Sequence, residues 1–234
     1  GSFYGSARPL DMAAVQAAFA ARLTERGISV RSVAAPATPS ATRPAPTSAV
    51  LGQVESAPVR EQLALALTDS DNALTEILAR QAAYRSGADT GFPATGAWVV
   101  ARVAALGLDT KGTVLQDASG LSRVNRVTAR LLADLLARAE GGSAVLRTAL
   151  QGLPVAGLSG TLAQRFRTGQ QGAVAGRARA KTGTLTGATA LAGTVVDDAG
   201  RLLVYSALVA GAGTSEARAA LDRFVAVLAS CGCR

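Results

Sequence analysis

The chain has 234 residues, of which 49% are hydrophobic, and its mean hydropathy is +0.26, so it can bury a sizeable core and does not have the composition of a disordered protein. Its net charge is +8 and it contains no histidine, which excludes a Ser-His-Asp triad, a Cys-His pair and a His-ligated zinc site within these residues. The two cysteines, Cys231 and Cys233, cannot close a zinc site alone, so no metal and no cofactor is expected.

The basic charge raises the question of a nucleic-acid partner. The arginines are scattered without a dense run, and aromatic residues make up only 4% of the chain. Nucleic-acid-binding surfaces instead combine clustered basic side chains with aromatic ones. We therefore expect no nucleic-acid partner. No apolar run reaches the roughly 18 residues that would span a bilayer, so no membrane span is expected in this chain.

Hydrophobic periodicity and turn residues predict the elements in chain order. The first part is predicted to contain a helix over 9–27, a strand over 28–33, an exposed Pro/Ala/Thr-rich loop over 34–48 and a strand over 49–55. Next come helices over 58–67, 70–87 and 95–107, a strand and turn over 113–120, and a helix over 126–142. The last part is predicted as a turn over 160–166, a strand over 173–183, a hairpin over 188–211 with its turn at 197–200, and a helix over 214–232. An antiparallel sheet flanked by helices is an α+β arrangement.

The stretch Lys-Thr-Gly-Thr at 181–184 carries the first candidate chemistry. Lys181 is one of only two lysines, and an ammonium, unlike a guanidinium, can lose its proton when its surroundings shift its pKa. Gly183 has no Cβ, so a substrate backbone can approach the strand edge and pair with it. Backbone N–H groups here can face a developing oxyanion. The alternative is an ordinary strand start with a surface lysine.

The stretch Ser70-Asp71-Asn72 lies at the start of a predicted helix. Taken alone, it is best explained as an N-cap, a position that all three residue types favour. Followed downstream by Lys-Thr-Gly in a chain without histidine, it has the order of the second and third motifs of a known serine acyl-transfer set.

Three further stretches strengthen this comparison. Residues 117–129, "DASGLSRVNRVTA", are similar to an Asp-Gly-Ser-Gly-Leu-Ser-Arg-x-Asn signature, with Ala118 in place of the usual glycine. The other two are "LPVAGLSGTLAQRF" at 153–166 and "RAKTGTLTGATALAG" at 179–193. Over roughly residues 10–230 the chain resembles the C-terminal part of the class C (type-4) low-molecular-mass penicillin-binding proteins, which are serine D-alanyl-D-alanine carboxypeptidases/endopeptidases. The ordered combination is specific where each piece alone is not.

The resemblance implies the penicillin-binding/β-lactamase-like transpeptidase fold, incomplete in this chain, with residues 1–234 forming the C-terminal portion of one such domain. The family's first motif, Ser-x-x-Lys, carries the nucleophile, but Leu108 and Ala178 stand three residues before the two lysines. We therefore expect the nucleophile and any inserted domains in an N-terminal part outside this chain, and we expect the chain alone to be inactive.

The resemblance also assigns site residues. Six are catalytic in the family's scheme: Ser70, Asn72, Lys181, Thr182, Gly183 and Thr184. Three line the pocket for the third residue of the peptide: Leu121, Arg123 and Thr186. In this scheme Ser70 relays protons, Asn72 binds the substrate amide, Lys181 and both threonines hold the carboxylate, and the Thr184 N–H supplies half of the oxyanion hole.

Other interpretations of the 117–125 stretch stay open. Arg123 is equally well explained as a surface ion pair, and Leu121 as a core residue. Asp117 and Asn125 are better explained as turn and cap residues than as catalytic ones.

The implied partners are peptidoglycan stem peptides and β-lactams, and the implied location is extracytoplasmic, either periplasmic or secreted. A second hypothesis is a non-catalytic module that binds peptidoglycan peptides, and a stand-alone nucleic-acid-binding protein is the least favoured. A β-lactamase would be a relative of the first hypothesis, but "SGLSR" and "PVAGLSGTL" favour the peptidase. The presence of Ser70, Asn72 and Lys181 together favours an enzyme over a module that lacks catalysis. The cysteines could pair with each other or with another partner, which would indicate an oxidising compartment.

Overall fold

The computed structural model describes residues 12–30, 52–142 and 144–231, and the chain divides into two units, residues 1–54 and 55–234. In the first unit the predicted helix is present as α1 (Met12–Glu25).

Two strands predicted near the start of the chain are wrong where the structure describes them. Residues 28–30 and 52–55 have no regular secondary structure, and Val54 is 97% exposed. A strand is stable only when another strand satisfies its backbone groups. Residues 28–30 (Ile-Ser-Val) have the composition of a strand but no strand among the described residues pairs with them, and residues 52–55 (Gly-Gln-Val-Glu) contain only one apolar side chain. The predicted loop at 34–48 and the remainder of both strands lie outside the described residues.

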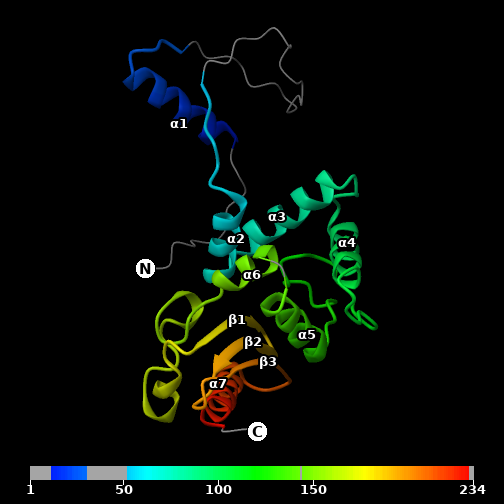
Figure 1. Cartoon of the computed structure of the whole chain (residues 1–234). Coiled ribbons are helices and arrows are strands. Elements are labelled where there is room, and N and C mark those ends of the chain that lie inside the picture. Colours follow the sequence, from blue (N-terminus) through cyan, green and yellow to red (C-terminus); the bar gives the residue numbers. More distant parts are fainter. Residues whose placement is uncertain (1–11, 31–51, 143, 232–234) are drawn as a thin grey trace. The chain divides into compact units, whose positions relative to one another are not determined.

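The helices of the second unit surround a small sheet (Figure 1). In chain order they are α2 (Val59–Thr68), α3 (Asn72–Arg85), α4 (Phe92–Ala104), α5 (Ala129–Glu140), α6 (Ala144–Gln151) and α7 (Thr214–Ser230). All but α6 were predicted. This short helix follows a glycine pair and packs against α2 and α5, so tertiary contacts rather than local signals stabilise it.

The sheet has three antiparallel strands in the order β1-β2-β3: β1 (Ala178–Leu185), β2 (Ala188–Val196) and β3 (Leu202–Ala210). The predicted hairpin and its turn are confirmed, and Asp197 stabilises the turn by accepting hydrogen bonds from the N–H groups of Ala199 and Arg201. β1 begins later than predicted because residues Gly169–Val174 form a 3₁₀ helix. The strand predicted before the 117–120 turn is reduced to a single bridge between Val114 and Arg126.

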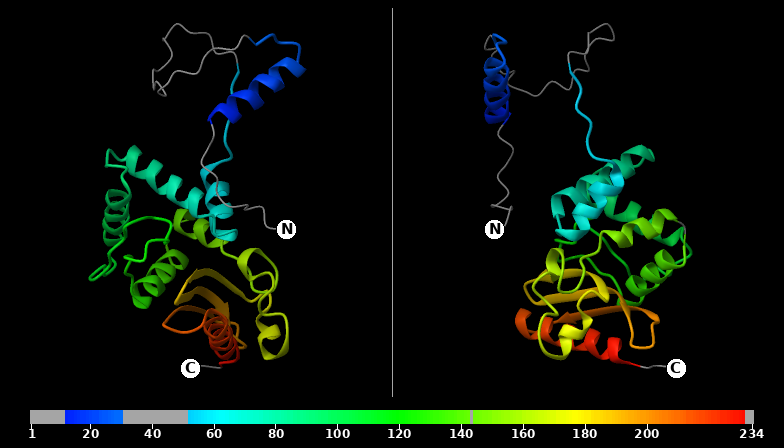
Figure 2. Two further views of the ribbon diagram at one scale, coloured as in Figure 1. Left: turned by 180° about the vertical axis from the view of Figure 1, so that it is seen from behind. Right: turned by 60° about the vertical axis from the view of Figure 1, so that its left-hand side comes forward.

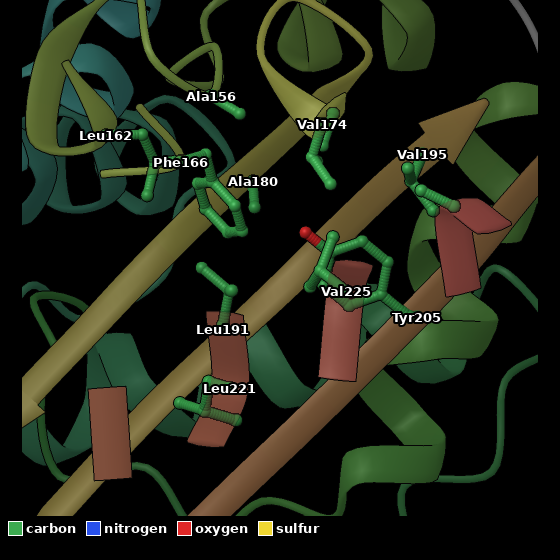
Figure 3. Packing of buried hydrophobic residues seen from close by; sticks show 12 residues of the cluster. Ala156, Leu162, Phe166, Val174, Ala180, Leu191, Val195, Tyr205, Leu221 and Val225 are labelled. Atoms are coloured by element: carbon green, nitrogen blue, oxygen red, sulfur yellow. The ribbon is translucent and has the colours of Figure 1, made fainter. Parts of the chain in front are cut away.

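The sheet lies between two layers of helices (Figure 2). Helix α7 covers one face, and α5 contacts β2 and β3 from the other. The main core fills the α7 side, where Leu191 and Val195 of β2 meet Leu221 and Val225 of α7 (Figure 3). Within the described residues, no helix is both long and apolar enough to cross a membrane.

Close packing between β1 and β2 depends on Gly193, which lies opposite Ala180. A Cβ at this position would stand 2.6 Å from both Ala180 Cα and Ala180 Cβ and would also collide with the Arg179 carbonyl oxygen. These atoms belong to the neighbouring strand and cannot move aside independently.

We therefore expect Gly193→Ala to lower the free energy of unfolding by about 2–3 kcal/mol, as other overpacked core sites do. The measurement is urea denaturation of the chain. Gly183→Ala in β1 is the matched control, because its Cβ would meet only Ala190 Cβ at 3.2 Å. Equal stability of the two variants would contradict this account of the packing.

Candidate active site

Ser70 lies at the junction of α2 and α3 in an unusual backbone conformation. Its φ is +57°, in the left-handed region that non-glycine residues seldom adopt. The cap of α3 is instead Asp71, whose Oδ1 accepts a hydrogen bond from the Leu74 N–H at 3.0 Å. The Ser70 hydroxyl is therefore not needed for capping and points to another partner.

That partner is Lys181, on β1. Its Nζ donates hydrogen bonds to Ser70 Oγ at 2.6 Å and to the Thr182 carbonyl oxygen at 2.7 Å. The structure thus joins two sequence motifs that are 111 residues apart. Burial lowers the pKa of Lys181 from its ordinary value of 10.5 to about 8, because desolvation disfavours the charged ammonium. No carboxylate among the described residues forms an ion pair with it.

The outer edge of β1 is covered at one end and not at the other. The Ala156 N–H donates to the Ala178 carbonyl oxygen and the Ala180 N–H donates to the Pro154 carbonyl oxygen, both at 2.9 Å. Alternate residues of a strand direct their backbone groups to the same edge. Thr182 and Thr184 therefore direct their N–H and C=O groups to this edge, beyond the covering segment.

Two side chains that the sequence did not single out contact the threonines of β1. Thr182 Oγ1 donates to Thr161 Oγ1 at 2.9 Å, and an Arg218 nitrogen donates to Thr184 Oγ1 at 3.2 Å. Thr161 lies within the stretch 153–166 that carried part of the resemblance, so the signal was present but was not assigned to a residue. Arg218 lies on the amphipathic helix α7 and is one of many arginines scattered along the chain. Nothing in the neighbouring sequence marks it as a site residue.

A close backbone approach brings Thr161 to the site. Gly160 has a φ of +53°, and a Cβ there would collide with the Thr68 carbonyl oxygen and stand 2.9 Å from Thr68 Cγ2. Thr68 is the last residue of α2, two residues before Ser70. The glycine therefore lets the 3₁₀ turn Gly160–Leu162 pack against the helix end that leads to Ser70.

The structure does not bring all the predicted residues together. Asn72 is the first residue of α3 and is exposed. Leu121 and Arg123 are exposed in the loop after Asp117, and Thr186 is exposed in the turn between β1 and β2. In the part of the chain that the structure describes, none of the last three makes a hydrogen bond or ion pair with Ser70 or Lys181.

The turn role predicted for Asp117 is confirmed, whereas the N-cap of α5 is Thr128 and not Asn125. The Asp117 carboxylate accepts hydrogen bonds from the N–H groups of Gly120 and Ser122, both at 2.7 Å, and from Asn125 Nδ2 at 3.0 Å. Burial raises the pKa of Asp117, but these hydrogen bonds together outweigh it and hold the pKa below its ordinary value. Asn125 Oδ1 in turn accepts from the Gln116 N–H at 2.7 Å.

A Ser-x-Asn helix start and a Lys-Thr-Gly strand are motifs of the penicillin-binding proteins, and comparison of structures gives the fold of that class. Penicillin-binding protein 4 of Haemophilus influenzae superposes with a TM-score of 0.65 at 22% identity, over 74% of this chain and 40% of that protein. The same protein in complex with a β-lactam gives a TM-score of 0.63 at 26% identity, over 73% of this chain and 40% of the other.

Sequence comparison identifies the family. The profile of the D-Ala-D-Ala carboxypeptidase 3 (S13) family matches residues 8–231. Carboxypeptidase DacB of Mycolicibacterium smegmatis is 42% identical over 185 residues, which are 78% of this chain and 40% of that protein. The D-alanyl-D-alanine carboxypeptidase of an Actinomadura species is 39% identical over 159 residues, 65% of this chain and 29% of the other. This chain belongs to the D-Ala-D-Ala carboxypeptidase 3 (S13) family, and it spans 40% or less of the length of these curated relatives.

The lowered pKa of Lys181 has a consequence for stability. Between pH 8 and 10.5 the unfolded chain retains a proton on this lysine that the folded chain has released, so the free energy of unfolding rises with pH in that window. Below pH 8 both states carry the proton, and the folded state bears the cost of burying the charge.

We expect the parent chain to gain stability relative to Lys181→Met as the pH rises from about 7 to about 10. The measurement is urea denaturation of both proteins at several pH values. Lys111→Met, which removes the chain's other lysine, from an exposed position, is the control. A difference between parent and Lys181→Met that stays constant with pH would show that the folded state does not depress the pKa of Lys181.

Proposed function

We propose that this chain is the C-terminal part of a serine-type D-Ala-D-Ala carboxypeptidase/endopeptidase that cleaves peptidoglycan stem peptides through an acyl-enzyme. The observation that carries the proposal is the 2.6 Å contact between Lys181 Nζ and Ser70 Oγ. The contact joins two of the three motifs of a serine acyl-transfer site in a chain that belongs to the S13 family. The nucleophile is a serine of a Ser-x-x-Lys motif, which these 234 residues do not contain.

The free edge of β1 is the place where a substrate would bind. The peptide would lie antiparallel to β1 as an added strand, with Gly183 allowing its backbone to come close. An ammonium has three N–H donors, of which Lys181 uses two on Ser70 and Thr182. The positive charge of Lys181 and the hydroxyls of Thr182 and Thr184 would then hold the substrate's terminal carboxylate.

The reaction has two halves. In the first, the serine oxygen attacks the carbonyl carbon of the penultimate D-Ala while the serine gives up its proton to the lysine of the same Ser-x-x-Lys motif. The N–H groups of Thr184 and of the serine itself stabilise the oxyanion. The C–N bond then breaks, and the departing D-Ala amine takes a proton relayed through Ser70. In the second half, water attacks the ester, which releases the shortened peptide and returns the proton to the serine.

The other predicted residues would recognise the rest of the peptide. Asn72, exposed at the start of α3, would hydrogen-bond the substrate amide. Leu121, Arg123 and Thr186 would surround the side chain of the third stem residue. Their exposure in this chain is compatible with contact to a ligand or to the remainder of the polypeptide.

The proposed substrate indicates the cellular location of the protein. Stem peptides lie outside the cytoplasm, so we place the whole protein in the cell envelope, either periplasmic or secreted. β-Lactams would react as substrate analogues whose ester with the serine persists, and a penicillin-binding protein 4 with the same fold has been solved with a β-lactam.

Denaturing intact-mass spectrometry after incubation with benzylpenicillin tests the proposal. We expect the polypeptide that carries these residues together with a Ser-x-x-Lys motif to gain the mass of one benzylpenicillin. The 23.5 kDa chain alone should gain none. If the longer polypeptide also gains none, the acyl-enzyme proposal is wrong, and a non-catalytic module that binds stem peptides becomes the function to test.

The same reaction with benzylpenicillin tests Ser70, because its hydroxyl should control the rate of acylation. We expect Ser70→Ala to slow acylation by benzylpenicillin about 10²- to 10⁴-fold, the usual contribution of a positioned proton-transfer group. Ser230→Ala is the matched control, because this exposed hydroxyl only donates to the Val227 carbonyl oxygen at the end of α7. Unchanged kinetics in Ser70→Ala would remove Ser70 from the proton path.

A further inference from the structure

A buried carboxylate connects α3 to the loop that carries Leu121 and Arg123. Glu76 lies one helical turn after Asn72 and is only 8% exposed. Its Oε2 accepts hydrogen bonds from the N–H groups of Ala118 at 2.8 Å and Ser119 at 3.1 Å. These partners are more than forty positions further along the chain, so the contact is tertiary and not part of local helix structure.

Two carboxylates divide the backbone donors of this loop between them. Asp117 accepts from the N–H groups of Gly120 and Ser122, while Glu76 accepts from those of Ala118 and Ser119. Asp117 belongs to the loop, so its bonds determine the shape of the turn. Glu76 belongs to α3, so its bonds determine where that turn lies against the helix.

The second oxygen of Glu76 takes no part in these hydrogen bonds. Oε1 is buried and has no hydrogen-bond partner among the described residues. A buried acceptor without a donor costs free energy, whereas hydrogen bonds to a carboxylate are stronger than those to a neutral group. Glu76 therefore holds the two backbone N–H groups through Oε2, while its buried Oε1 has no donor among the described residues.

We propose that Glu76 is a positioning residue that fixes the distance between the Ser70–Asn72 segment and the side chains of Leu121 and Arg123. Asn72 and Glu76 are four residues apart and therefore lie on the same side of α3. The helix acts as a rigid spacer between the place where the amide is held and the place where the third stem residue is recognised. The inference rests on the proposed function and adds to it the residue that makes the third-residue pocket selective.

The test uses Glu76→Gln and Glu76→Ala in the full polypeptide that carries this chain. Asp134→Asn is the control, because Asp134 is an acidic residue on α5 that pairs with the exposed Arg130. The first readout is hydrogen exchange resolved to single amides. The second is kcat/KM for two stem peptides that end in D-Ala-D-Ala and differ only in their third residue, a diamino acid or alanine.

We expect Glu76→Ala to speed hydrogen exchange of the Ala118 and Ser119 amides at least about tenfold, because a loss of about 1.4 kcal/mol of protection is a tenfold change in rate. Exchange of the Gly120 and Ser122 amides should change less. The preference for the diamino-acid peptide should fall about tenfold, a loss expected when a positioning group is displaced. The alanine peptide should change less than about twofold. Glu76→Gln keeps one accepting oxygen, so it should be intermediate in both readouts and is the variant that best preserves folding.

The outcomes separate the alternatives. Unchanged exchange at Ala118 and Ser119 would overturn the anchor itself. Faster exchange with an unchanged preference, or an equal fall for both peptides, would reduce Glu76 to a structural residue and overturn its role in selectivity. If the parent polypeptide neither cleaves either peptide nor reacts with benzylpenicillin, the proposed function has failed, and the exchange result still decides whether Glu76 anchors the loop.

Discussion

The candidate site depends on one partly buried ammonium group among neutral acceptors. Lys181 Nζ contacts a hydroxyl and a carbonyl oxygen, and no carboxylate within the described residues neutralises it. An unpaired buried cation has a lowered pKa and attracts an anion. The surrounding structure holds this group in place: the junction of α2 and α3 provides the hydroxyl, and the antiparallel pairing of β1 with β2 fixes the strand that carries the lysine.

Most of the α+β fold could be predicted from the sequence, because its helices and its hairpin have strong periodicity and clear turn residues. The failures have physical causes. Residues 28–30 have the composition of a strand but no strand in the described part of the chain pairs with them, and residues 52–55 contain only one apolar side chain. The opposite error occurred at α6, an eight-residue helix whose apolar residues do lie on one face and which packs against α2 and α5.

Only the site residues that belong to known motifs could be predicted from the sequence. The order of Ser70, Asn72 and Lys181 indicated a shared site, and the contact between Ser70 and Lys181 agrees with that expectation. Periodicity could not have placed them together, since the contact is a result of the tertiary fold. Thr161, Arg218 and Glu76 were not predicted because each matters through a distant partner. A single acidic residue beside the apolar stripe of α3 was a weak signal for Glu76.

The backbone of Ser70 has a consequence for how this sequence can change over time. A serine with φ near +57° is strained relative to glycine or asparagine, which adopt this conformation more readily. Random substitution to glycine would therefore relax the chain while it removes the hydroxyl. Backbone strain thus disfavours serine at this position, while the hydrogen bond that its hydroxyl accepts from Lys181 favours it. If Ser70 relays protons as we propose, a mutation to glycine would relieve this strain and lower activity at the same time.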